Sequence, residues 1–245
     1  MGVLEKHGNH LPLGTDMYTS TAICKAAAEI EPAIVFPYYF FGQIAEAIHY
    51  PGTLAVSHQM MMDTLLTVCD EIGRNGIKKI MVMSGHGGNN HFLPFFAQEM
   101  PRLNRGYQVY TGFAVGLTEA QRKEIQEIAG YDDLGQHAGL AETSLMMFLQ
   151  PELIHSEAQD PAEGRDLGRL AGIKEEGLFT GFNWYASYPN HYAGDHSLAT
   201  PELGKKIFDM IVDNTVQKIK AVKADGESIE LINEFAARGK TPKCN

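Results

Sequence analysis

Three short stretches of this 245-residue chain combine histidine with carboxylate side chains. In the first stretch, Glu5 and His7 are two residues apart, so an extended backbone places both side chains on the same face. Asp16 follows His7 at the expected start of a helix that runs to residue 30. Carboxylate and imidazole groups that converge in this way suit Zn, Mn or Fe ions. The same spacing equally fits a helix N-terminal Asp16 and a surface His7.

The second stretch, SGHGGN, follows the apolar run IMVM and contains His86. A glycine turn after a strand also suits a bound phosphate, but this stretch contains neither GxGxxG nor Gly-Lys-Ser/Thr. We therefore interpret His86 as a metal ligand, and Gly87 as a residue that lets metal and substrate approach the backbone. Nucleotide or phosphate binding is the weaker alternative.

In the third stretch, QHAGLAETS, His137 and Glu142 flank an Ala-Gly turn, and Glu142 begins an otherwise apolar helix. Each residue alone has an ordinary explanation, because Glu142 could complement the helix dipole and His137 could be a loop residue. Three such clusters in one chain, each at a junction between a loop and a regular element, favour one shared site.

Strand and helix patterns alternate along the chain. The expected strands are 33–37, 77–83 and 107–116, and the expected helices are 16–30, 57–74, 89–104, 117–130, 142–151, 200–224 and 228–238. Residues 154–195 lack periodicity and predict a long functional loop region. We expect an α/β fold, a single-domain three-layer α/β/α sandwich over residues 1–245 with a mainly parallel sheet. Ligands bind beyond the carboxyl ends of the strands in such folds.

Composition excludes several classes of protein. The chain has 30 Asp and Glu residues against 20 Lys and Arg, a net charge of −10, which argues against binding to nucleic acid or anionic lipid. No stretch approaches the roughly 18 apolar residues of a membrane span. Cys24, Cys69 and Cys244 are scattered and form no CxxC, so we expect no disulfide scaffold. A cytoplasmic protein without nucleic-acid or membrane partners is expected.

The chain resembles the creatininase (creatinine amidohydrolase / formamide hydrolase) family. The resemblance rests on EKHGNHLPLGTD, FPYYFFGQIAEAIHYPGTLAV, MVMSGHGGN, GQHAGLAETS and YAGDHSLATPELGK, which span nearly the whole chain in family order. It implies a creatininase-like fold and a centre of two divalent metal ions, with zinc favoured and manganese or iron as alternatives. By this resemblance, the ligands of one metal would be Glu5, Asp16 and His86, and those of the other His7, the bridging Asp16 and Glu142.

The same resemblance implies a metal-dependent hydrolase that cleaves a C–N bond in a small non-peptide amide, cyclic amidine or formamide. A metal-bridging hydroxide would attack the carbonyl carbon, with His137 as proton shuttle beside Glu142. The alternative is a catalytically silent, metal-bound family member that acts as a binding or assembly subunit. A homo-oligomer, commonly a hexamer, is also implied.

The resemblance is incomplete after the histidine of the glycine turn. Creatininase itself carries Tyr and a metal-binding Glu there, whereas this chain has Gly87 and Gly88, so the second metal must take its carboxylate from Glu142. In the long loop, Trp184 and Tyr188 are expected to contact substrate. His49, His58 and His91 are expected to be structural rather than to line the site. Only four residues precede Glu5, and fraying there would lower the occupancy of its metal.

Overall fold

The computed structural model describes residues 1–242. Its described part contains one sheet of two parallel strands, β1 (Lys79–Ser84) and β2 (Gln108–Phe113). The register pairs Lys79 with Gln108 and Ser84 with Phe113. Parallel strands need a crossover connection, and the helix α3 (Asn89–Leu103) provides it.

Eight further α-helices are described in residues 1–242. They are α1 (Thr15–Ile30), α2 (His58–Arg74), α4 (Glu119–Ala129), α5 (Leu140–Leu149), α6 (Ala171–Glu175), α7 (Asn183–Ser187), α8 (Pro201–Ala224) and α9 (Glu227–Lys240). Four short 3-10 helices are η1 (Ala45–Ala47), η2 (Pro151–Leu153), η3 (Ser156–Ala158) and η4 (Pro161–Gly164).

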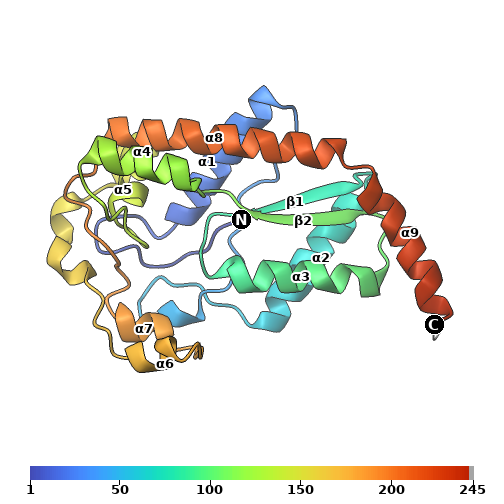
Figure 1. Cartoon of the computed structure of the whole chain (residues 1–245), viewed down its shortest axis with the longest axis horizontal. Coiled ribbons are helices and arrows are strands. Elements are labelled where there is room, and N and C mark those ends of the chain that lie inside the picture. Colours follow the sequence, from blue (N-terminus) through green and yellow to red (C-terminus); the bar gives the residue numbers. More distant parts are fainter. Residues whose placement is uncertain (243–245) are drawn as a thin grey trace.

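Helices cover both faces of the sheet, which gives three layers (Figure 1). On one side, α1, α5 and α8 share a core that includes Ile23, Leu140 and Ile207. On the other side, α2 and α3 pack against the strands through Leu65, Phe96 and other buried residues. This arrangement confirms the predicted α/β fold, although the sheet is smaller than expected.

Side chains cap the N-terminal ends of three helices. Ser57 caps α2 by accepting a hydrogen bond from the backbone of Met60, and Thr200 caps α8 in the same way from Leu203. Thr118 and Gln121 form a capping box at the start of α4. The helix α3 continues through Pro94 and Pro101 to Leu103, in agreement with the helix expected at residues 89–104.

The predicted strand at residues 33–37 is wrong. This segment is irregular, and the side chain of Ile34 is 85% exposed. Pro32 precedes this segment and Pro37 ends it, and neither has an N–H to donate to a neighbouring strand. The apolar residues that predicted a buried strand therefore lie largely at the surface.

Two of the three cysteines, which were expected to form no disulfide scaffold, lie in the described residues. Cys24 and Cys69 are free thiols, and Cys244 lies outside the described residues. None of the helices described in residues 1–242 is long and apolar enough to cross a bilayer.

Candidate metal centre

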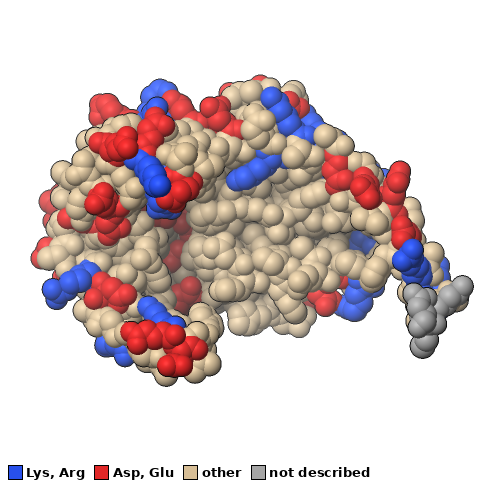
Figure 2. All heavy atoms as spheres, viewed as in Figure 1, with Lys and Arg blue, Asp and Glu red and all other residues tan. Residues whose placement is uncertain are grey.

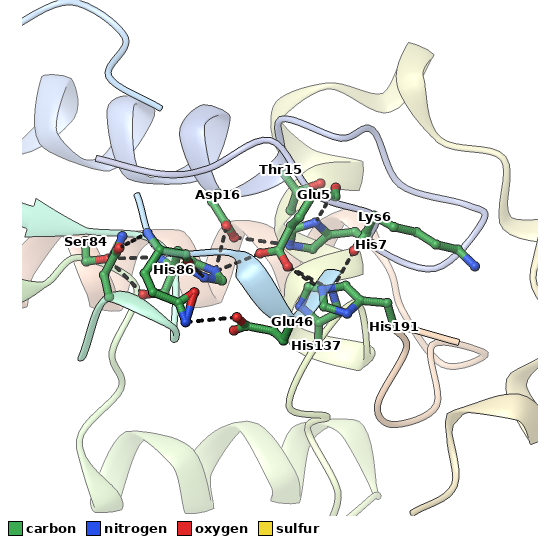
Figure 3. A network of polar contacts seen from close by, with 12 residues as sticks. Glu5, Lys6, His7, Thr15, Asp16, Glu46, Ser84, His86, His137 and His191 are labelled. Carbon is green, nitrogen blue, oxygen red and sulfur yellow. Dashed lines mark hydrogen bonds and ion pairs between the residues drawn. The ribbon is translucent and has the colours of Figure 1, made fainter. Parts of the chain in front are cut away.

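The first cluster is held in place by backbone hydrogen bonds before α1 begins. The Glu5 N–H donates to the Leu13 carbonyl at 3.1 Å, and His7 forms an isolated antiparallel bridge with Leu11. Asp16 lies in the first turn of α1. Glu5, His7 and Asp16 are each at most 2% exposed, so the start of the chain is not frayed at Glu5. Figure 3 shows these side chains converging.

His86 lies in the turn between β1 and α3, beyond the carboxyl end of β1. Ser84 at the end of the strand fixes this turn, because its hydroxyl donates to the His86 carbonyl and accepts from the His86 N–H. Asn89, which is fully buried, donates to the same hydroxyl and accepts from the Gln43 N–H. These hydrogen bonds hold His86 beyond the carboxyl end of β1, where ligands bind in folds of this kind.

The third cluster sits on a turn that leads into α5. His137 pairs with Ala193 as an antiparallel bridge, and Ala138 has a positive φ of 55°. Gly135 and Gly139 allow this tight turn, because a Cβ on either would lie 2.6 Å from the Cα of the other. The Ala138 N–H donates to the Glu142 carboxylate at 2.5 Å. The turn therefore aims His137 and Glu142 at the same region.

The three clusters meet at one site. Two of its groups have ligand atoms within 4.8 Å of one another, and they share Asp16: one is Glu5, Asp16 and His86, and the other is His7, Asp16 and Glu142. A third group of the same kind is Glu5, His7 and His137. The first two are the ligand sets that the family resemblance implied. Asp16 directs Oδ1 at His7 and Oδ2 at His86, each at 3.1 Å, as a bridging carboxylate would.

Each of the two imidazoles has one ring nitrogen against a backbone carbonyl. His86 Nε2 lies 2.8 Å from the Gln43 oxygen, and His7 Nδ1 lies 3.4 Å from the Glu5 oxygen. A proton on these nitrogens leaves a lone pair on the opposite nitrogen of each ring. Those opposite nitrogens face carboxylates: His86 Nδ1 lies 2.7 Å from Glu5 Oε1, and His7 Nε2 lies 3.9 Å from Glu142 Oε2.

Electron-pair donors therefore face one another at the centre. Glu5 Oε1 and Asp16 Oδ2 are buried and accept no hydrogen bond from any group in residues 1–242. Buried carboxylate oxygens without partners are costly unless a cation balances them. Oxygen and imidazole donors in this mixture suit Zn, Mn or Fe. The residues present thus fit two divalent cations.

Without metal, the same groups share protons unequally. Burial opposes charge on His7 and His86, but the adjacent Asp16 and Glu5 carboxylates prevail, raising the pKa of His7 to about 9 and that of His86 well above its usual value. Burial and the neighbouring His7 lower the pKa of His137 well below its usual value. Burial raises the pKa of Glu142 to about 7 despite His7. Protonated His7 and His86 therefore stand in for the cations.

A cavity of about 1760 Å³ opens onto these residues. Its wall includes Glu5, Asp16, His86, His137 and Glu142, together with apolar side chains from α3 and from residues 179–185. In Figure 2 acidic side chains are recessed in a hollow beside a broad uncharged face. The centre is therefore buried in the protein but reachable from outside.

The residues proposed to contact substrate are placed differently from one another. Gly87 lines the cavity, and a Cβ there would meet nothing within 4 Å. Trp184 also lines it, whereas Tyr188 packs against Trp184 with ring centroids 4.9 Å apart and is not among the lining residues. Three histidines that were expected to be structural lie on the cavity wall instead: His49, His58 and His91.

Sequence reasoning missed two polar contributors. His191 lies within the long loop region expected over residues 154–195, and its Nε2 lies 2.5 Å from Glu5 Oε2. Glu46, from η1, lines the cavity and accepts a hydrogen bond from the Gln43 side chain at 2.9 Å. Neither lies beside one of the three motifs, so only the folded chain reveals their places.

Comparison with known sequences shows which family the chain matches. The family model Creatininase, described as creatinine amidohydrolase, matches residues 1–219. A Pseudomonas putida creatinine amidohydrolase is 28% identical over 168 residues, which cover 63% of this chain and 64% of that protein. The chain thus matches somewhat less than two thirds of that relative's length. A mycofactocin precursor peptide peptidase from Mycobacterium ulcerans is 27% identical over 236 residues, covering 89% of this chain and 82% of that protein.

Comparison with solved structures supports the fold. A structure described as "Creatininase Mn" superposes with a TM-score of 0.70 at 22% identity, covering 90% of this chain and 88% of that one. Another creatininase structure is described as a Zn–Zn type. At this level of identity the likeness establishes the shared architecture, and the names describe the metals of those proteins.

Proposed function

Because this chain belongs to the creatininase family, we propose that it is a metal-dependent amidohydrolase acting on a non-peptide C–N bond. The substrate class is a small amide, cyclic amidine or formamide. The observation that carries this proposal is the pair of ligand sets that share Asp16, with the neutral imidazole of His137 beside them.

Two divalent cations, when bound, lower the pKa of a shared water and polarise a carbonyl group. The protein's own residues do the rest. Asp16 spans the two sites, Glu5 and His86 complete one, and His7 and Glu142 complete the other. Glu5, His7, Asp16 and His86 are buried and Glu142 is half-buried. Such an environment strengthens electrostatic stabilisation of negative charge that develops on the substrate.

His137 is the proposed proton shuttle. Its Nε2 lies 2.7 Å from the Lys6 carbonyl and is therefore the protonated nitrogen. Nδ1 is the ring nitrogen that remains without a proton, and the residue lines the cavity. A neutral imidazole can accept a proton at Nδ1 and pass it to the departing nitrogen of the substrate. Accepting the proton makes the ring an imidazolium, and donating it to the leaving nitrogen restores the neutral form.

The proposed substrate contacts come from the cavity wall. Gly87 leaves open space next to His86, and Trp184 offers an aromatic surface beside His137, with ring centroids 5.7 Å apart in an edge arrangement. Tyr188 backs the Trp184 ring. A planar amide group could lie against Gly87 and Trp184 with its carbonyl toward the carboxylate and imidazole cluster.

We also propose that the protein is a homo-oligomer, as a hexamer by family resemblance, and that it works in the cytoplasm. Large apolar side chains at the surface support self-association, since Ile34, Phe179 and Phe182 are each at least 70% exposed. Free Cys24 and Cys69 suit a reducing compartment. Sedimentation of the purified protein measures the number of subunits.

Elemental analysis of untagged protein tests the central proposal. We expect about two divalent metals per chain in the unmodified protein and about one in the His7→Ala and Glu142→Ala variants. A Glu157→Ala variant, which changes a surface carboxylate outside the site, serves as the matched control and should keep both metals.

A screen of amides and formamides then distinguishes an amidohydrolase from a metal-bound protein without catalytic activity. Hydrolysis that needs both metals supports the amidohydrolase. Two metals per chain without turnover of any amide would favour the catalytically silent binding or assembly subunit. One metal or none in the unmodified protein would contradict the binuclear centre.

A further inference from the structure

The residues around Glu5 include a histidine and a tryptophan that the proposed mechanism does not use. His191 is 1% exposed, and its Nε2 lies 2.5 Å from Glu5 Oε2. The indole N–H of Trp184 donates to His191 Nδ1 at 3.0 Å. The order Trp184, His191, Glu5 is therefore a continuous chain of hydrogen bonds that ends on a carboxylate of the metal centre (Figure 3 shows its Glu5 and His191 end).

The direction of this chain follows from the chemistry of its first member. An indole N–H can only donate, so Nδ1 of His191 must be the acceptor. The proton of a neutral His191 ring then lies on Nε2, which donates to Glu5 Oε2. The other oxygen, Oε1, is left for the centre, where it faces His86 Nδ1 at 2.7 Å and accepts no hydrogen bond.

The backbone of His191 is held in an unfavourable conformation. Its φ is +54°, in the left-handed region that residues other than glycine rarely adopt. Its carbonyl accepts from the Gly8 N–H at 3.2 Å, and its own N–H donates to the Tyr188 carbonyl at 3.0 Å. The surrounding chain thus fixes the ring where it reaches Glu5, and ties it to both the first motif and α7.

We propose that His191 and Trp184 are positioning residues that hold the Glu5 carboxylate in its metal-binding orientation. The inference rests on the metal centre proposed above. Groups that orient a metal ligand from outside the ligand set typically change metal affinity 10- to 100-fold when they are removed. Trp184 also lines the cavity. A change in the position of its segment would therefore alter the hydrogen bonds that orient Glu5, and with them the affinity for the metal that Glu5 binds.

The test is a chelator competition with Zn²⁺ on five proteins: the unmodified chain and His191→Phe, His191→Gln, Trp184→Phe and Tyr188→Phe. In His191→Phe we expect one of the two metals to bind about 10- to 100-fold more weakly, with the other unchanged. His191→Gln keeps an N–H that can reach Glu5 and should restore most of the affinity. Trp184→Phe should weaken the same metal by a smaller factor.

Tyr188→Phe is the matched control, since it keeps the ring that packs on Trp184 and loses only the hydroxyl. We expect both of its affinities to equal those of the unmodified protein. A merely structural role would weaken both metals together, so loss confined to one metal identifies positioning of Glu5. If His191→Phe does not fold, the comparison of Trp184→Phe with His191→Gln carries the same test.

Trp184 also provides a second readout, because it is the only tryptophan in the chain. Its emission should change when Zn²⁺ binds, and the midpoint of that change should lie at higher Zn²⁺ in His191→Phe than in the unmodified protein. Equal Zn²⁺ affinities in the unmodified protein, His191→Phe and Trp184→Phe would overturn the positioning pair and leave the metal centre intact. No Zn²⁺ binding by the unmodified protein would overturn both.

Discussion

The rings of His7 and His137 lie against each other, with centroids 4.1 Å apart and planes inclined by 35°. A proton on one ring therefore opposes a proton on the other. In the metal-free chain His7 takes the proton, because Asp16 raises its pKa to about 9 against the effect of burial. His137 stays neutral, since burial and His7 both lower its pKa.

The first prediction concerns this neutral ring. His137→Ala should lower kcat for any amide that the unmodified enzyme hydrolyses by about 10²- to 10⁴-fold, the usual contribution of a proton-transferring group. Metal content should stay near two per chain. His155→Ala, which changes an exposed histidine, is the control and should leave kcat unchanged. Unaltered kcat in His137→Ala would remove His137 from the mechanism.

The second prediction is a pH dependence of the metal-free protein. His7, with its pKa raised to about 9, binds a proton more tightly when folded than the unfolded chain does near pH 6.5. Its stabilising contribution is complete below about pH 6.5 and is lost as the pH rises through 9. Glu5 and Asp16 also raise the pKa of His86, against the effect of burial. The stabilising contribution of His86 is therefore lost with rising pH as well.

Denaturant unfolding in excess chelator between pH 7 and 9 measures this effect. The free energy of unfolding should fall by about 1.4 kcal/mol per pH unit for each histidine that is protonated only in the folded state. His7→Gln should lose part of the fall. Metal-loaded protein should lack it, since bound metal replaces those protons. A free energy independent of pH in chelator would contradict the assigned protonation of His7.

The third prediction concerns the hydroxyl of Thr143, which is fully buried. Thr143 donates to the Ala138 carbonyl at 3.1 Å and lies 2.9 Å from His10 Nε2. Thr143→Val keeps the shape but leaves both partners unpaired, so the free energy of unfolding should fall by about 1–3 kcal/mol. Thr143→Ser keeps the hydroxyl and should lose less. Equal losses in the two variants, measured by denaturant unfolding, would argue against the hydrogen bonds.

The fourth prediction compares two glycines in helices. A Cβ on Gly204 of α8 would lie 1.8 Å from the Ser144 carbonyl of α5, whereas one on Gly239 of α9 would meet nothing within 4 Å. Gly204→Ala should therefore destabilise the protein by about 1–3 kcal/mol or more, since the two helices must separate. Gly239→Ala should stabilise it by up to about 1 kcal/mol. Thermal unfolding of both variants gives the comparison, and a Gly204→Ala variant as stable as the parent would contradict the packing.

The metal-binding candidates could be predicted because their chemistry lies in short local motifs. Glu5 and His7 share a face of extended chain, and His86 and Glu142 lie at junctions between loops and regular elements. Which residues meet across those motifs came from the family resemblance, and the fold brings the same sets together. Their roles as ligands, and the single domain over residues 1–245, stay predictions.

The missed features depend on contacts between distant parts of the chain. His191 reaches Glu5 only because the irregular segment before it folds back over the first motif, and no periodicity marks that path. The strand expected at residues 33–37 failed for the opposite reason. Apolar, β-branched composition is local, but a strand also needs a partner, and Pro32 and Pro37 limit pairing there.

The long separation between Glu5 and His191 also has a consequence for how the molecule folds. The two residues are 186 positions apart, and closing so large a loop costs conformational entropy that local helix formation does not. On the ribosome, His191 is synthesised 186 residues after its partner Glu5. The contact that orients this carboxylate therefore forms only after β1, β2, α2 and α3 have been synthesised, and before α8 is complete.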